Sequence, residues 1–153
     1  MQTNNEVGGT MYSFLACTVG QFMTRTVLTV ERLTTMRELA ALFEEHDFNA
    51  FPVIEDGKML GIISKFDFLR AFAFTQSQIL PRYDELMSRP AAEVMTEAVV
   101  SVDMQSPLTR VLQLMVNLKT RSFPVINPDG QLEGIISRED VMRALKEATQ
   151  QTP

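Results

Sequence analysis

Apolar residues recur along the chain with the spacing of buried helix faces. Two stretches carry them at positions i, i+3, i+4 and i+7, which predicts two amphipathic helices. The first follows Thr35-Met36-Arg37-Glu38, which fits a capping box, although the repeat alignment given below would place the cap at Thr34. The second follows Ser106-Pro107, with Ser106 as the expected cap. The two stripes are Met36, Leu39, Ala40 and Phe43, and Leu108, Val111, Leu112 and Met115.

Short apolar runs bounded by turn residues predict strands after each helix. Residues 51–55 and 58–63 flank Asp56-Gly57, which is a strong signal for a tight hairpin. The corresponding turn in the second half is Asn127-Pro128-Asp129-Gly130. A short strand is expected before each unit, at residues 27–30 and 99–102. A last helix is expected to begin near Ser64 and near Ser137, with the apolar residues Phe66, Leu69 and Phe72 in one, and Val141, Met142 and Leu145 in the other.

The two halves of the chain are homologous repeats. Phe22-Met23-Thr24 aligns with Val94-Met95-Thr96, and Phe51-Pro52-Val53-Ile54 aligns with Phe123-Pro124-Val125-Ile126. After one inserted residue in the turn, Gly61-Ile62-Ile63-Ser64 aligns with Gly134-Ile135-Ile136-Ser137. The predicted fold class is therefore α+β, built from tandem β-α-β-β-α repeats with pseudo-twofold symmetry. The expected boundaries are 1–17 for a tail and leader, 18–74 for the first repeat, 75–89 for a connection, 90–148 for the second repeat and 149–153 for a tail.

Composition excludes several classes of function. The 153 residues carry a net charge of −5, which argues against a nucleic-acid surface. With one cysteine, Cys17, and one histidine, His46, neither a Cys-rich or His-based metal cluster nor a nucleophile-base pair can be assembled. His46 fits best at a solvated helix end. No apolar run reaches the about 18 to 20 residues that span a bilayer, and no secretory signal is evident, so a cytoplasmic protein without a membrane partner is expected.

The pattern Gly-Ile-Ile-Ser-x-x-Asp occurs twice, ending at Asp67 and at Asp140. One interpretation is structural, because Ser-x-x-Asp resembles a capping box with an acid near the positive end of a helix. The other interpretation is a ligand site. Free N–H groups and a hydroxyl at a helix start suit a phosphate, and a carboxylate can accept paired hydrogen bonds from a ribose diol. The two interpretations do not exclude each other.

The two copies of this pattern differ in the positively charged residues expected near them. Lys65 and Arg138 directly follow the two serines, and Arg121 is expected to converge with Arg138 beside Ser137 and Asp140. The equivalent of Arg121 in the first repeat is Asn49, which is neutral. The pocket at Ser137 is therefore the better candidate for a phosphate.

These motifs, in this order and twice over, closely resemble a cystathionine-β-synthase (CBS) domain pair, also called a Bateman module. The resemblance extends from about residue 19 to residue 148. It implies a cleft between two sheets with two sites for adenosine-type ligands, namely AMP, ADP, ATP or S-adenosylmethionine. No cofactor is required, and homodimers formed through helices are frequent in the family.

The resemblance also implies which residues bind. Ser137 with Asp140, and Ser64 with Asp67, would contact phosphate and ribose. The base would be held by positions of the opposite repeat, which are Thr26, Leu28, Asn49 and Ala50 for the Ser137 site, and Ala98, Val100, Arg121 and Ser122 for the Ser64 site. Glu139 would repel further phosphates, which favours an AMP-like ligand over ATP.

The expected function is a stand-alone sensor that binds an adenine nucleotide and signals to an effector protein, not an enzyme. The alternative is an interaction module whose sites are degenerate and empty. A small hydrolase that uses the aspartates is a third and weaker hypothesis, because neither a Walker-type nor a Gly-x-Gly-x-x-Gly loop is present.

Overall fold

The computed structural model describes residues 13–73 and 82–150. It forms two compact units. The central unit comprises Leu28–Val99, and the discontinuous unit comprises Met1–Val27 together with Val100–Pro153. Each unit is described by itself. Each contains a helix, two antiparallel strands and a further helix in that order, so the α+β fold of repeated units is confirmed.

The central unit is built around a three-stranded sheet. Strand β1 runs parallel to β2, and β2 is antiparallel to β3. In chain order its elements are β1 (Val30–Glu31), α3 (Met36–Glu45), β2 (Ala50–Glu55), β3 (Lys58–Ser64), α4 (Lys65–Ala71), α5 (Tyr83–Met87) and α6 (Ala91–Val94). The buried core includes Met36, Leu39, Phe51, Val53 and Ile63, as the helix stripe and the alternating strands predict.

The discontinuous unit repeats this arrangement with a two-stranded sheet. It contains α2 (Val19–Phe22), α7 (Leu108–Leu118), β4 (Ser122–Ile126), β5 (Leu132–Ser137) and α8 (Arg138–Gln150). A single parallel bridge, Val102 to Val125, takes the place of β1. The strands expected at 27–30 and 99–102 are therefore shorter than predicted, because only Val30, Glu31 and Val102 reach the neighbouring strand.

The structure decides between the two candidate caps of α3 and corrects the expected cap of α7. The Thr35 hydroxyl accepts a hydrogen bond from Glu38 N, so Thr35 caps α3. The prediction of Ser106 as a cap is wrong, since the residue at that position is Pro107. The hydroxyls of Thr34 and Ser106 close the preceding turns instead, accepting from Glu31 N at 3.0 Å and Asp103 N at 3.2 Å.

The predicted tight hairpin in the central unit is confirmed. Asp56 and Gly57 have φ angles of 51° and 79°, the two positive values that a type I′ turn requires. In the discontinuous unit Asn127 organises the longer turn, because its side-chain oxygen accepts from the backbone N–H groups of Asp129 and Gln131.

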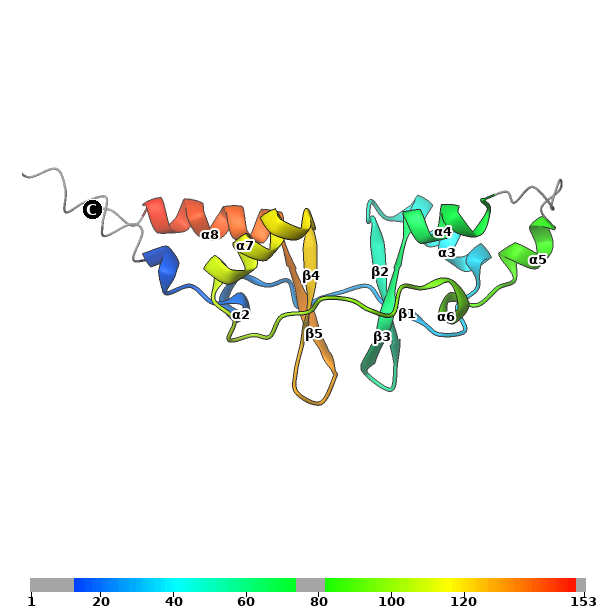
Figure 1. The fold of residues 1–153 in the computed structure, drawn as a ribbon, viewed down its shortest axis with the longest axis horizontal. Coiled ribbons are helices and arrows are strands. Elements are labelled where there is room, and N and C mark those ends of the chain that lie inside the picture. Colours follow the sequence, from blue (N-terminus) through cyan, green and yellow to red (C-terminus); the bar gives the residue numbers. More distant parts are fainter. Residues whose placement is uncertain (1–12, 74–81, 151–153) are drawn as a thin grey trace, which may run out of the picture. The chain divides into compact units, whose positions relative to one another are not determined.

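The repeats exchange their leading segments, which are residues 18–27 and residues 90–99. Each segment packs in the unit that contains the hairpin of the other repeat. Thr24 forms an antiparallel bridge with Ile135 in the discontinuous unit, and Thr96 forms one with Ile62 in the central unit. Helix α2, which belongs to the first repeat in sequence, thus packs with α8 of the second repeat, and α6 packs with β3 of the first (Figure 1).

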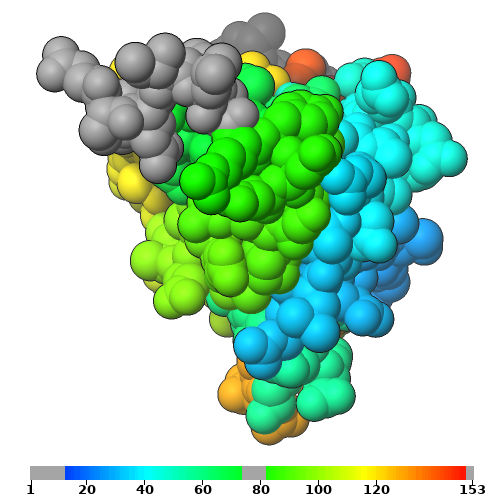
Figure 2. All heavy atoms as spheres, turned by 90° about the vertical axis from the view of Figure 1, so that its right-hand side faces the viewer, coloured from blue at the N-terminus to red at the C-terminus, as the bar shows by residue number. Residues whose placement is uncertain are grey.

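A second contact ties the exchanged segment into the central unit. Ala91 N donates to Thr34 O at 2.7 Å, and Met36 N donates to Arg89 O at 2.9 Å. The green segment with α5 and α6 accordingly lies beside the blue to cyan segment that enters α3 (Figure 2). Helix α5 falls within the segment expected as a plain connection, and Met87 at its end is buried in the core. Residues 74–81 of that segment lie outside the described residues.

The last helices bury less of their apolar surface than the sequence suggests. Phe66 and Leu69 of α4 are 70% and 66% exposed, and Met142 of α8 is 67% exposed. The side chains that α4 and α8 turn inward include Phe68 and Val141. Both helices therefore present apolar residues on their outer faces.

Candidate functional site

The second Gly-Ile-Ile-Ser-x-x-Asp motif spans the junction of β5 and α8. The Asp140 carboxylate oxygen Oδ2 accepts from Ser137 N and from Ser137 Oγ, both at 2.9 Å. Asp140 N donates back to Ser137 Oγ at 3.3 Å. The structural interpretation of the motif is thus confirmed here: serine and aspartate cap the helix reciprocally, and Asp140 is buried with 3% exposure.

Arg143, which the sequence analysis missed, completes this arrangement. Its Nη1 donates to Asp140 Oδ1 at 3.1 Å, and its Nη2 donates to the carbonyl oxygen of Phe22 at 2.8 Å. The guanidinium also lies 5.9 Å from the centre of the Phe22 ring. The available signal was an arginine three residues after each motif aspartate, a spacing at which helical side chains meet.

The first motif, between β3 and α4, repeats the cap. Asp67 Oδ2 accepts from Ser64 N and Ser64 Oγ at 2.9 Å, and Asp67 N donates to Ser64 Oγ at 3.0 Å. Its Oδ1 accepts from Arg70 Nη2 at 2.7 Å and from Thr96 Oγ1 at 3.0 Å. Thr96 belongs to the exchanged segment, so the side chain of that segment reaches the motif directly.

Backbone hydrogen bonds bring the expected cations Arg121 and Arg138 next to each other. Arg138 N donates to Arg121 O at 3.0 Å, and Lys65 N donates to Asn49 O at 2.9 Å in the central unit. Arg121 and Arg138 are exposed, and within the described residues neither guanidinium has a hydrogen-bond or ion-pair partner. The discontinuous unit therefore presents two uncompensated positive charges beside Ser137.

The residues expected to hold a base divide between the units. In register, Ser122 pairs with Ser137, and Ala50 pairs with Ser64. Val100 is 48% exposed and lines a pocket of about 300 Å³ with Ile126 and Asn127, at the end of β4 opposite Ser122. Because the resemblance pairs these positions with motifs of the opposite repeat, their binding roles stay predictions. The same holds for Thr26, Leu28 and Ala98, which are exposed.

The other reactive side chains do not form a site in the described part of the chain. Cys17 Sγ donates to Ser13 O at 3.2 Å, and burial, with a smaller contribution from Glu147, raises the pKa of the thiol. His46 ends α3 and lies against the Phe48 ring, with 5.7 Å between centres, as expected for a helix terminus. Residues 13–73 and 82–150 hold no group of three metal-ligating side chains and no helix that could cross a membrane.

Comparison with known proteins decides the family. The model of the CBS domain matches residues 19–74 and again residues 91–147. The chain belongs to the CBS domain family. The two matches cover most of the chain, and they coincide with the two repeats that the sequence motifs define.

CBS proteins of similar sequence and structure support this assignment. CBSX1 of Arabidopsis thaliana, a chloroplastic CBS domain-containing protein, is 32% identical over an alignment that covers 83% of this chain. The crystal structure of CBSX2 in complex with AMP superposes with a TM-score of 0.73 at 27% identity, covering 85% of this chain and 96% of that one.

Two of these relatives are longer proteins than this chain. This chain spans 63% of CBSX1 and 45% of MJ0188 from Methanocaldococcus jannaschii, to which it is 29% identical over 86% of its own length.

Proposed function

We propose that this CBS domain pair is a regulatory module that binds an adenine nucleotide, with AMP as the best candidate. The observation that carries the proposal is the helix start at Ser137, where a serine hydroxyl, a buried carboxylate and two arginines without a partner among the described residues gather. The N–H groups of Arg138 and Asp140 are already hydrogen-bonded, so the attraction for a phosphate comes from the positive end of the 13-residue helix α8 and from the two arginines. The AMP complex of CBSX2, a related chain of similar fold, supports the choice of ligand.

Each group has a proposed role. At the Ser137 site the guanidinium groups of Arg138 and Arg121 bind phosphate, and Asp140, held in place by the hydroxyl of Ser137, binds ribose. The base is held by Thr26, Leu28, Asn49 and Ala50 of the opposite repeat. Exposed Glu139 disfavours additional phosphates, so AMP is preferred over ATP. The second site uses Ser64, Lys65 and Asp67 with Ala98, Val100, Arg121 and Ser122.

Thermal unfolding tests the proposal. We expect AMP to raise the melting temperature, because a ligand at a hundred times its dissociation constant stabilises the folded state by about 2.7 kcal/mol. ADP, ATP and S-adenosylmethionine are compared at the same concentrations, with free phosphate as a control for nonspecific anion effects. If none of the four shifts the transition, the module does not sense adenine nucleotides, and an interaction module with empty sites is the correct description.

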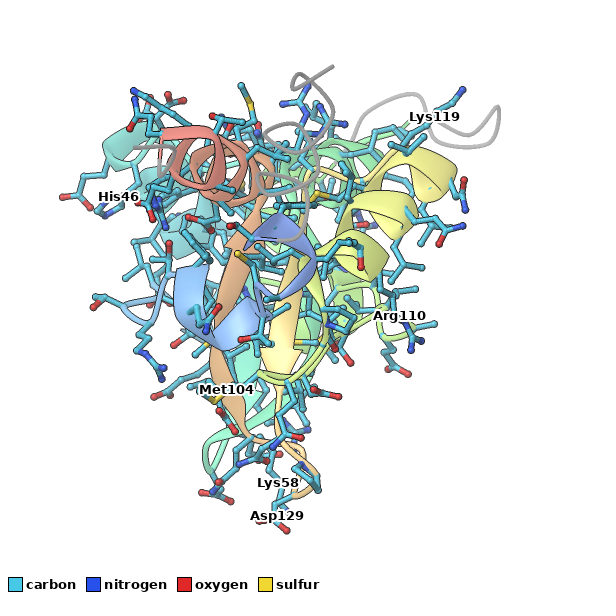
Figure 3. The ribbon with its side chains drawn as sticks, turned by 90° about the vertical axis from the view of Figure 1, so that its left-hand side faces the viewer. His46, Lys58, Met104, Arg110, Lys119 and Asp129 are labelled. Carbon is cyan, nitrogen blue, oxygen red and sulfur yellow. The ribbon has the colours of Figure 1, made fainter. Side chains whose placement is uncertain are left out.

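We further propose that the module forms a homodimer through its helices. Helices α7 and α8 enclose an apolar groove of about 350 Å³, lined among others by Leu112, Val116, Met142 and Leu145. Lys119, which ends α7 and points away from the ribbon (Figure 3), and Arg138 border it. Exposed apolar side chains gathered on two neighbouring helices are typical of an association site, and a second copy is the occupant we propose. In the central unit, the outer face of α4 also exposes two apolar side chains, Phe66 and Leu69.

Sedimentation velocity tests the dimer. We expect Met142→Glu combined with Val116→Glu to convert a dimer to a monomer, because the two charges would be buried in the interface. Both side chains are 67% exposed in the single chain, so the folding stability of the monomer should change little. Leu33→Glu, at a position that is 71% exposed and lies outside the helices, is the matched control and should stay dimeric. A wild-type protein that sediments as a monomer at all concentrations contradicts the proposal.

Signalling to an effector protein and a cytoplasmic location stay predictions, as does the absence of catalysis by the module itself. Signalling would require that the nucleotide bind two conformations of the chain with different affinity.

A further inference from the structure

The two motif aspartates differ in how many hydrogen bonds they can still accept. A carboxylate offers about four acceptor positions, two on each oxygen. At Asp67 all four are occupied: Ser64 N and Ser64 Oγ donate to Oδ2, and Arg70 and Thr96 donate to Oδ1. A new donor at Asp67 must therefore displace one that is already present.

Asp140 retains one open position. Ser137 N and Ser137 Oγ occupy Oδ2, while Oδ1 accepts from Arg143 alone. Thr24 is the counterpart of Thr96 and makes the same backbone bridge, to Ile135, but its hydroxyl has no hydrogen-bond partner in the described part of the chain. The difference between the sites therefore comes from one side-chain hydroxyl.

Burial does not explain the difference, because both aspartate side chains are 5% exposed. What separates them is acceptor capacity. A ribose hydroxyl can donate to Asp140 without breaking a bond, whereas at Asp67 it must replace the Thr96 hydroxyl or the Arg70 guanidinium. A hydrogen bond to a charged group corresponds to about 10- to 100-fold in affinity.

We propose that the two sites are unequal, and that Thr96 makes them so by withholding Asp67 from ribose. The inference rests on the proposed nucleotide binding. Each chain then binds one AMP tightly, with its ribose on Asp140, and a second AMP about 10- to 100-fold more weakly on Asp67. Thr96 acts through Asp67 and is a positioning residue for the weaker site.

Isothermal titration of the full chain with AMP tests this inference. Thr96→Val removes the hydroxyl, keeps the size of the side chain and leaves the backbone bridge to Ile62 intact. We expect the second binding step to tighten by about 10-fold while the first stays unchanged. The matched control is Thr24→Val, which should alter neither step. Thr96→Ser retains the hydroxyl and should behave as wild type, which separates loss of the hydrogen bond from a general disturbance of the fold.

A second ligand shows whether the effect concerns ribose. With 2′,3′-dideoxy-AMP, which has no ribose hydroxyl, Thr96→Val should give no gain at the second step. Two equal sites in the wild-type protein, or an unchanged second step in Thr96→Val, would overturn the inference alone. Absence of AMP binding in both wild type and Thr96→Val would overturn the proposed function as well.

Discussion

Replacing Gly134 by alanine is expected to lower the free energy of unfolding by about 3 kcal/mol, the upper end of ordinary overpacking costs. A Cβ at this position would lie 2.5 Å from the carbonyl oxygen of Thr24 and 3.3 Å from the sulfur of Met23. The oxygen belongs to backbone that is itself hydrogen-bonded to Ile135, so it cannot move aside without breaking the bridge. Urea denaturation followed by circular dichroism measures the change.

Gly130→Ala is the matched control in the same hairpin. Gly130 has a φ of 83° and nothing within 4 Å of an added Cβ. Alanine there should lower the free energy of unfolding by about 1 kcal/mol, because it must adopt a left-handed backbone conformation. Gly61→Ala should resemble Gly134→Ala, since its Cβ would lie 2.5 Å from the Thr96 carbonyl oxygen. If both alanine variants lost the same free energy of unfolding, the backbone at Thr24 would be able to move away from an added Cβ at Gly134, which would contradict the prediction.

The same contact shows what the sequence could and could not predict. The strands of the two hairpins, the turn at Asp56-Gly57 and the stripe of α3 follow from local spacing, and the structure confirms them. The stripe of α7 is confirmed except at Leu112, which is 36% exposed. The repeat alignment matched Gly61 with Gly134, but it did not show why glycine is needed at these positions. That reason is the close approach of Thr24 or Thr96, a residue distant in sequence whose position depends on how the whole chain folds.

For the candidate site, the sequence predicted the motif residues but not the side chains that contact them. Ser137 and Asp140 were identified from their repetition, and the helix-capping geometry follows from their spacing. The three donors to the Oδ1 oxygens of the aspartates, Arg70, Thr96 and Arg143, were missed. Arg143 lay within reach of a helix-spacing argument, whereas Thr96 reaches Asp67 only because the repeats exchange their leading segments. The expectation that a carboxylate accepts a ribose diol in pairs also changes, because neither aspartate has two open acceptor positions.

Asparagine substitutions at the two aspartates should separate helix capping from ligand binding. Asp140 and Asp67 make the same bonds to their serines and are equally buried, so Asp140→Asn and Asp67→Asn should cost similar stability, about 2 kcal/mol. Each substitution keeps the size of the side chain and removes the charge that strengthens its hydrogen bonds. Denaturation in urea gives both losses directly.

Their effects on AMP should differ. Asp140→Asn is expected to weaken the tight binding step by about 10- to 100-fold, because the ribose hydroxyl loses a charged acceptor, while Asp67→Asn should leave that step within about 3-fold of wild type. Titration calorimetry at equal fractions of folded protein measures both. If the two variants bind AMP as tightly as wild type while losing stability, the carboxylates are helix caps alone, and the nucleotide must be held by the phosphate-binding groups around Arg121 and Arg138 instead.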